Sequence, residues 1–271
     1  MRLLRANLRK LPRRPATWVT FLLLIGLNAL ITFFVILGSK IATDPQGALA
    51  ARQFLTFPTA YELVLSMVIG LGGLLAVTYG AAIAGSEWTW GTLKAAVARG
   101  EGRTRYTLLT YVAVAGFTFL GLLGAFLVGV VVSAIGALIV GVPLDGMADT
   151  DALLGLPERL GRAGLAMAMN AALGYAIATV ARSQLAGIGV GIGLFFAESI
   201  AGFFVPHIIK WFPFSASGAV VTGGAGGSTV VNGQELGASL DATTAILVTI
   251  AWLVVSLAVA SLWTERAEIG G

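Results

Sequence analysis

The stretch ATWVTFLLLIGLNALITFFVIL, residues 16–37, decides the fold class of this chain. It contains no charged residue, and it is longer than the roughly 20 apolar residues that a helix needs to cross the hydrocarbon core of a bilayer. The whole chain of 271 residues is 57% hydrophobic and 11% charged. A soluble domain would carry about a quarter charged residues. The sequence therefore predicts an integral membrane protein whose surface faces lipid.

Further apolar runs of similar length follow the first one. They predict an all-α membrane protein with six transmembrane helices. The third run is longer than one crossing requires, so that helix is tilted or continues beyond the membrane. We find no linker and no long internal repeat, and we expect one transmembrane domain over residues 1–271. The six predicted spans are residues 16–38, 62–85, 106–137, 162–181, 185–205 and 242–263.

The basic residues indicate how the spans are oriented. With the amino terminus inside, the inner segments hold twelve Lys and Arg residues and the outer segments hold five. Basic residues are enriched on the cytoplasmic side of membrane proteins. We therefore expect both termini and residues 86–105 in the cytoplasm. This distribution also explains the net charge of +4 without a nucleic-acid partner, for which the chain offers no water-soluble basic domain.

The first 15 residues, MRLLRANLRKLPRRP, contain six basic residues and no acid. On a helix, Leu4 and Leu8 lie on one side and Arg5 and Arg9 on the other. This pattern is typical of a helix that lies in the membrane interface. A basic start before an apolar run also resembles a signal peptide, but this run is too long and no small-residue cleavage site follows it. We expect an interfacial helix over residues 1–15 and an uncleaved first span.

A polar stretch, GSEWTWGTLKAAVARGEGRTRY, separates the second and third spans at residues 85–106. Residues 86–98 can form a short helix on which Trp90, Leu93 and Val97 share a face. One interpretation is an interfacial connecting loop. The other is a docking surface, in which Glu87 pairs with a basic residue of a partner protein and the tryptophans fill a pocket.

The same stretch resembles the first cytoplasmic loop of type-2 ATP-binding-cassette (ABC) exporter permeases. Glu87 lies four residues before the Gly91–Thr92 pair, a short helix follows, and Arg103 and Arg105 precede the third span. The family often has Pro and Ser before its basic residue, whereas this chain reads RGEGRTR. Residues 172–199, ALGYAIATVARSQLAGIGVGIGLFFAES, are similar to the fourth span, Arg-Ser turn and fifth span of the family, and WFPFSAS follows in the expected place.

The resemblance implies that the short helix is a coupling helix seated in a groove of a separate ATPase subunit. It also implies two permease copies, identical or paralogous, and two ATPase copies in each transporter. ATP and Mg²⁺ would bind the ATPase, and we expect no cofactor in this chain, because it has no G-x-x-x-x-G-K-[ST] loop. The expected ATPase-coupling residues are Glu87, Trp88, Trp90, Gly91, Thr92, Leu93, Val97 and Arg103.

Three polar residues lie within predicted spans. Asn28 and Asn170 are single amides that more often join helices by hydrogen bonds than contact a substrate. Glu198 is a carboxylate in the fifth span. An ionised group in hydrocarbon is unfavourable, so Glu198 either serves the transport pathway or pairs with a polar group near the outer surface.

The segment GIGVGIG, residues 187–193, has small residues at helical spacing. This pattern favours close helix packing through Gly187, Gly189, Gly191 and Gly193. No metal site is expected, because cysteine is absent and His207 is the single histidine.

We therefore expect a permease of an ABC exporter in a bacterial inner membrane, and no enzyme activity in this chain. The resemblance implies that two copies form a pathway lined by the first, second and fifth spans. The alternative is an ATP-independent secondary carrier or a channel. Ion-coupled carriers usually contain several intramembrane acids or matching broken helices in two halves. The apolar, aromatic-containing spans favour a hydrophobic or amphipathic cargo.

Overall fold

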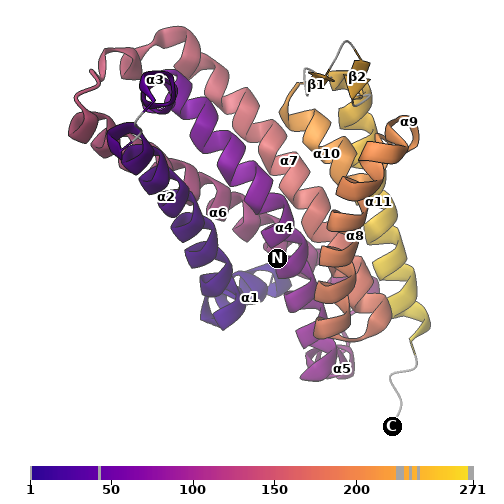
Figure 1. Cartoon of the computed structure of the whole chain (residues 1–271). Helices are drawn as coiled ribbons and strands as arrows, with labels where there is room; N and C mark the ends of the chain where they lie inside the picture. Colours follow the sequence, from indigo (N-terminus) through magenta and orange to yellow (C-terminus); the bar gives the residue numbers. More distant parts are fainter. Residues whose placement is uncertain (1, 42–43, 224–228, 232–233, 237–238, 268–271) are drawn as a thin grey trace. The chain divides into compact units, whose positions relative to one another are not determined.

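The computed structural model describes residues 2–41, 44–223, 229–231, 234–236 and 239–267 (Figure 1). Within these residues, six helices are long and apolar enough to cross a membrane. The chain is therefore a mainly helical, multi-pass membrane protein, and the six predicted spans are confirmed as helices. They are α2 (Pro15–Ile41), α4 (Thr59–Thr89), α6 (Arg103–Val140), α7 (Thr150–Ala181), α8 (Gln184–Phe204) and α11 (Ala242–Arg266).

The fourth helix differs from its predicted span. Residues 138–161 were expected between spans, but α7 already begins at Thr150 and contains Pro157. The Asp149 side chain accepts a hydrogen bond of 2.8 Å from the backbone N–H of Ala152, which satisfies one of the unpaired donors in the first turn of the helix. Hydropathy locates only the apolar part of a helix, so the polar first turns of α7 were missed.

Short elements fill the connections. The helices are α1 (Arg2–Lys10), α3 (Pro45–Gln53), α5 (Thr92–Ala98), α9 (Pro206–Ile209) and α10 (Pro213–Val221), and the 3₁₀ turns are η1 (Leu11–Arg13) and η2 (Asp145–Ala148). Strands β1 (Thr229–Val231) and β2 (Gln234–Leu236) pair antiparallel, with Val231 opposite Gln234. This small hairpin is an exception to the all-α prediction.

The chain divides into two compact units, which are described separately. Unit 1 comprises residues 1–18, 73–119 and 162–271, and unit 2 comprises residues 19–72 and 120–161. A single functional domain over the whole chain stays a prediction.

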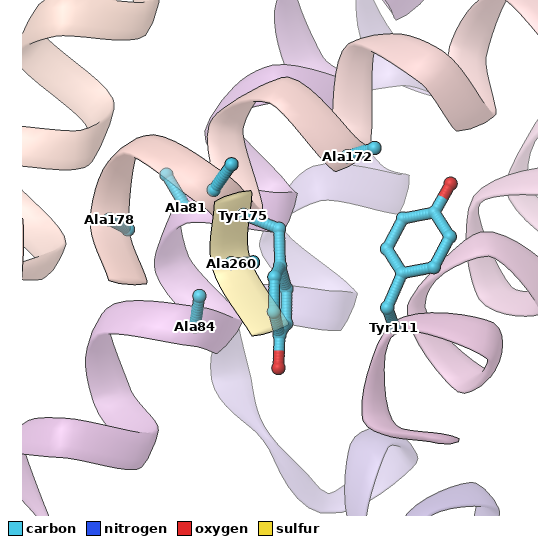
Figure 2. Close-up of a cluster of buried hydrophobic side chains, with 8 residues drawn as sticks. Ala81, Ala84, Tyr111, Ala172, Tyr175, Ala178 and Ala260 are labelled. Carbon is cyan, nitrogen blue, oxygen red and sulfur yellow. The ribbon is translucent and has the colours of Figure 1, made fainter. Parts of the chain in front are cut away.

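In unit 1 the core is built from small residues and two tyrosines. Figure 2 shows alanines of α4, α7 and α11 gathered around the rings of Tyr111 and Tyr175, whose centroids lie 6.0 Å apart. A Cβ added at Gly80 would lie 2.0 Å from the carbonyl oxygen of Ala171, and one added at Gly174 would lie 1.9 Å from that of Val77. The backbones of α4 and α7 therefore approach closely, as small residues permit in membrane helices.

Unit 2 has a separate aromatic core. Phe57 and Phe126 both contact the ring of Tyr61. The Tyr61 hydroxyl donates a hydrogen bond of 2.8 Å to the carbonyl of Met147, so its polar end is satisfied inside the unit. These contacts join the first turns of α4 to α6 and η2.

Candidate functional site

The joint between α4 and α5 lies at Gly91, in unit 1. Gly91 has a φ of +61°, a left-handed conformation that glycine adopts readily and other residues avoid. The predicted single helix over residues 86–98 is therefore wrong: α4 continues to Thr89, and α5 begins at Thr92. Glu87 and Trp88 belong to the last turn of α4 and not to the short helix.

Glu87 is buried, with 4% of its surface exposed, and it is ion-paired inside its own chain. The Lys10 ammonium lies 2.8 Å from Oε1 and 3.1 Å from Oε2 of the carboxylate. The Arg14 guanidinium lies 2.5 Å from Oε1 and also donates to the hydroxyl of Ser86. Two cations of the N-terminal segment therefore already occupy the carboxylate that was expected to pair with a basic residue of another protein.

Two hydroxyl groups complete the surroundings of the carboxylate. The side chains of Thr92 and Tyr106 both donate hydrogen bonds to Oε2 of Glu87. We call Lys10, Arg14, Ser86, Glu87, Thr92 and Tyr106 the Glu87 cluster. Its members come from α1, from the residue that joins η1 to α2, and from α4, α5 and α6, so the cluster ties these segments together. Charge-assisted hydrogen bonds of this kind are shorter and stronger than neutral ones.

The N-terminal helix α1 makes further contacts in the same place. Asn7 is buried and donates a hydrogen bond of 3.1 Å to the Thr110 hydroxyl of α6. Leu3 packs against a group of buried side chains on α5 and α6. Burial lowers the pKa of Lys10 below its ordinary value of 10.5, and the Glu87 carboxylate offsets part of that effect. Part of the polar side of α1 therefore faces protein.

The outward-facing part of α5 differs from the predicted one. Leu93 is only 4% exposed and packs with Ala96 and Tyr106, so it is not free to meet a partner. Val97 packs partly against the same group. Trp90 is 61% exposed, with the Arg14 guanidinium 5.0 Å from its ring centroid. We call the exposed residues of α5 and of its two flanks the α5 outer face; they are Trp90, Lys94, Ala95, Ala98 and Arg99.

Arg103 was expected to act in ATPase coupling at the start of the third span. Its guanidinium instead donates to the backbone carbonyls of Glu265 (2.8 Å) and Ala267 (2.9 Å). Thr104 adds a hydrogen bond of 2.5 Å to the Glu265 carboxylate. The last carbonyls of a helix lack partners within it, and a cation there is favourable. Arg103 therefore joins the start of α6 to the end of α11.

The intramembrane polar residues do not form one site. Oε2 of Glu198 accepts hydrogen bonds from the backbone N–H groups of Phe214 (3.1 Å) and Ser215 (3.0 Å), so Glu198 satisfies the first turn of α10. Asn170 accepts a hydrogen bond of 3.4 Å from Ser217, which joins α7 to α10. Asn28 is buried and makes no hydrogen bond through its side chain within the described ranges. The interhelical hydrogen bond predicted for Asn28 is therefore not formed.

The four glycines of residues 187–193 divide into two kinds. A Cβ at Gly187 would lie 2.4 Å from the Cβ of Ala178, and one at Gly191 would lie 3.0 Å from a methyl group of Val77. A Cβ at Gly189 or Gly193 would meet no such atom within 4 Å. Of these four glycines, Gly187 and Gly191 therefore pack closely against other described helices, and Gly189 and Gly193 do not.

Sequence reasoning missed Lys10, Arg14 and Tyr106 as partners of Glu87. Lys10 and Arg14 precede it by 77 and 73 residues, and no local motif relates them. The only signal in the sequence was charge, because an acid next to an apolar span favours a cationic partner. That signal does not select among the six basic residues at the start of the chain. Among the described residues, no group of three His, Asp or Glu side chains is arranged to hold a metal ion.

Comparison of the chain with models of known protein families finds no match, and comparison with curated proteins finds none either.

Proposed function

We propose that this chain is the membrane-spanning permease subunit of an ABC exporter, driven by a separate ATPase subunit. The observation that carries the proposal is the α4–α5 joint. A short helix with an exposed basic and aromatic face follows a spanning helix, and a buried ion cluster ties it to its neighbours. A docking helix needs both properties, an accessible face and a stiff connection to the membrane helices.

The Glu87 cluster gives a route for movement. A displacement of α5 acts on Thr92, whose hydroxyl is bonded to Glu87 at the end of α4. Through the same carboxylate it acts on Tyr106 at the start of α6, and on Lys10 and Arg14 of the N-terminal segment. In this proposal α5 is the coupling helix, and Glu87 transmits its movement without touching the ATPase.

The remaining parts of the proposal follow from the sequence. α1 is an interfacial helix, both termini lie in the cytoplasm, and two permease copies in a bacterial inner membrane form the pathway. ATP and Mg²⁺ bind the partner ATPase. In this proposal the ATPase contacts the residues of the α5 outer face. Glu87 and Leu93, which were expected from the sequence to take part in ATPase coupling, do not contact it.

A secondary carrier is the competing function, and Glu198 is the observation that favours it. Oε1 of this buried carboxylate has no hydrogen-bonding partner in the described part of the chain, and intramembrane acids often serve ion coupling. The two functions differ in their energy source. Transport that stops on ATP depletion and survives collapse of the proton gradient supports the exporter, and the reverse result supports the carrier.

The docking proposal is tested by mild-detergent pull-down of the tagged protein from its native membrane. The variant Trp90→Ala with Lys94→Glu changes two residues of the α5 outer face, of which Trp90 also contacts the Arg14 guanidinium. The matched control is Trp211→Ala with Lys210→Glu, which makes the same two kinds of change beside α9, at the opposite end of α8 from its Ser183 cap (Figure 1).

We expect an ATP-binding protein to copurify with the wild type and the control and to be lost from the α5 variant. If no ATP-binding protein copurifies with any of the three, α5 is an interfacial connector, and a carrier or channel becomes the better account.

A further inference from the structure

A pocket of about 310 Å³ opens beside the C-terminal end of α11, within unit 1. It lies between the last turns of α11 and the link that connects α7 to α8. It is separate from the α5 outer face and from Glu198. Its lining residues are Arg182, Val259, Leu262, Trp263, Arg266 and Ala267.

Two cations face this pocket. The ion pairs that the structure shows among its described residues include neither Arg182 nor Arg266. The guanidinium of Arg182 lies over the ring of Trp88, 5.1 Å from its centroid. Stacking of this kind uses the face of the guanidinium and leaves its N–H groups able to bind phosphate oxygens. The pocket is therefore a cationic site with an aromatic support.

The remaining wall is apolar and uncovered. Val259, Leu262 and Trp263 are all exposed, and they belong to the last turns of a helix that is apolar enough to cross a membrane. The end of such a helix lies at the level of the lipid headgroups, where tryptophan is enriched. A free phosphate ion would make no favourable contact with this apolar wall, whereas the upper part of an acyl chain would cover it.

We propose that this pocket binds an anionic phospholipid, with its phosphate between Arg182 and Arg266 and an acyl chain along Val259, Leu262 and Trp263. Basic pockets between membrane helices are suited to such headgroups. The bound lipid would bridge the α7–α8 link and the end of α11. The proposal requires only that the helices span a membrane, so it stands or falls independently of the exporter function.

The test is native mass spectrometry of the detergent-purified protein, titrated separately with phosphatidylglycerol, phosphatidylcholine of the same chain length, and inorganic phosphate. The variant is Arg182→Gln with Arg266→Gln. The control, Lys94→Gln with Arg99→Gln, removes the same charge from the exposed α5 outer face.

We expect saturable binding of phosphatidylglycerol that is at least about tenfold weaker in the pocket variant, because two charge-assisted contacts are lost, and unchanged in the control. Equal binding of the two lipids, or equal loss in the control, would overturn the proposal. Binding of inorganic phosphate as tight as that of phosphatidylglycerol would show a phosphate site and overturn the lipid assignment.

A second measurement does not depend on the folding of the double variant. Phosphatidylglycerol with brominated acyl chains quenches nearby tryptophans, and we compare the wild type with Trp263→Phe. We expect part of the tryptophan quenching by brominated phosphatidylglycerol to disappear in Trp263→Phe. In the wild type, brominated phosphatidylcholine should quench less than brominated phosphatidylglycerol. Quenching that is identical in the two proteins would place the lipid elsewhere.

Discussion

Removal of the Glu87 charge should destabilise the protein far more than removal of an exposed acid on the same helix. The Glu87 and Arg14 side chains are 5% and 6% exposed, so their charges are screened little by solvent. Breaking a buried ion pair by neutralising one partner typically costs about 3–5 kcal/mol, because the other charge stays buried without compensation. We expect a loss of this size in the free energy of unfolding for Glu87→Gln.

The other members of the cluster give graded effects. Arg14→Gln leaves Glu87 paired with Lys10, so its loss should lie at the lower end of the same range. The Lys10 side chain is 33% exposed, and its replacement by Gln should cost about 1 kcal/mol or less, as for partly exposed pairs. The double variant Arg14→Gln with Glu87→Gln should cost less than the sum of the single variants by about 2 kcal/mol, because the two residues interact directly.

The assay is reversible denaturant unfolding in mixed micelles, followed by tryptophan fluorescence. Glu62→Gln is the matched control, since Glu62 also lies on α4 and its ion pair with Arg159 is exposed (62% and 45% for the two side chains). It should change stability by less than about 1 kcal/mol. A Glu87→Gln loss no larger than that of Glu62→Gln, or a coupling between positions 14 and 87 below about 0.5 kcal/mol, would refute the reasoning.

Three further outcomes follow from the contacts of α8, α10 and α11. Gly187→Ala should lower the free energy of unfolding by about 1–3 kcal/mol, because its Cβ would lie 2.4 Å from that of Ala178. Gly189→Ala has no such neighbour within 4 Å and should change the free energy of unfolding by less than about 0.5 kcal/mol. Equal effects of the two variants in denaturant unfolding would contradict the packing. Glu198→Ala should cost about 1–3 kcal/mol because the first N–H groups of α10 lose their acceptor. Glu198→Gln should cost less, since one acceptor oxygen remains, and a thermal melt that ranks the two the other way would contradict this role. Asp241 caps α11, and hydrogen bonding from the side chain and backbone N–H of Thr244 lowers the pKa of Asp241 below the ordinary 3.8. The stabilisation of the folded protein by this carboxylate should be complete above pH 3.8 and should disappear as the pH falls through the lowered pKa of the folded state. An Asp241→Ala protein whose stability depends on acid pH as in the wild type would exclude this contribution.

The spans could be predicted from the sequence because hydropathy is a local property. Residues 16–37 must be helical in a bilayer whatever the rest of the chain does, since unpaired backbone groups are unfavourable there. The same signal fails at polar helix ends. It placed residues 150–161 outside a helix, although Asp149 caps a helix that already begins at Thr150.

The site could be located from the sequence but not built. The polar stretch marked the joint, because its charged residues stand out between two long apolar runs. Whether Glu87 faces outward or inward depends on residues more than 70 positions away, and no periodicity carries that information. The burial of Leu93 likewise results from Tyr106 and the N-terminal helix folding over α5.

Site-specific photo-crosslinking in native membranes tests the central claim most directly. A photoreactive phenylalanine analogue is placed at Lys94 on the α5 outer face, at the adjacent buried Leu93, and at Lys210 beside α9. The account predicts a cross-link from position 94 to an ATP-binding protein, and none to such a protein from positions 93 and 210. Absence of that product at position 94, or its equal formation at position 210, would contradict the account.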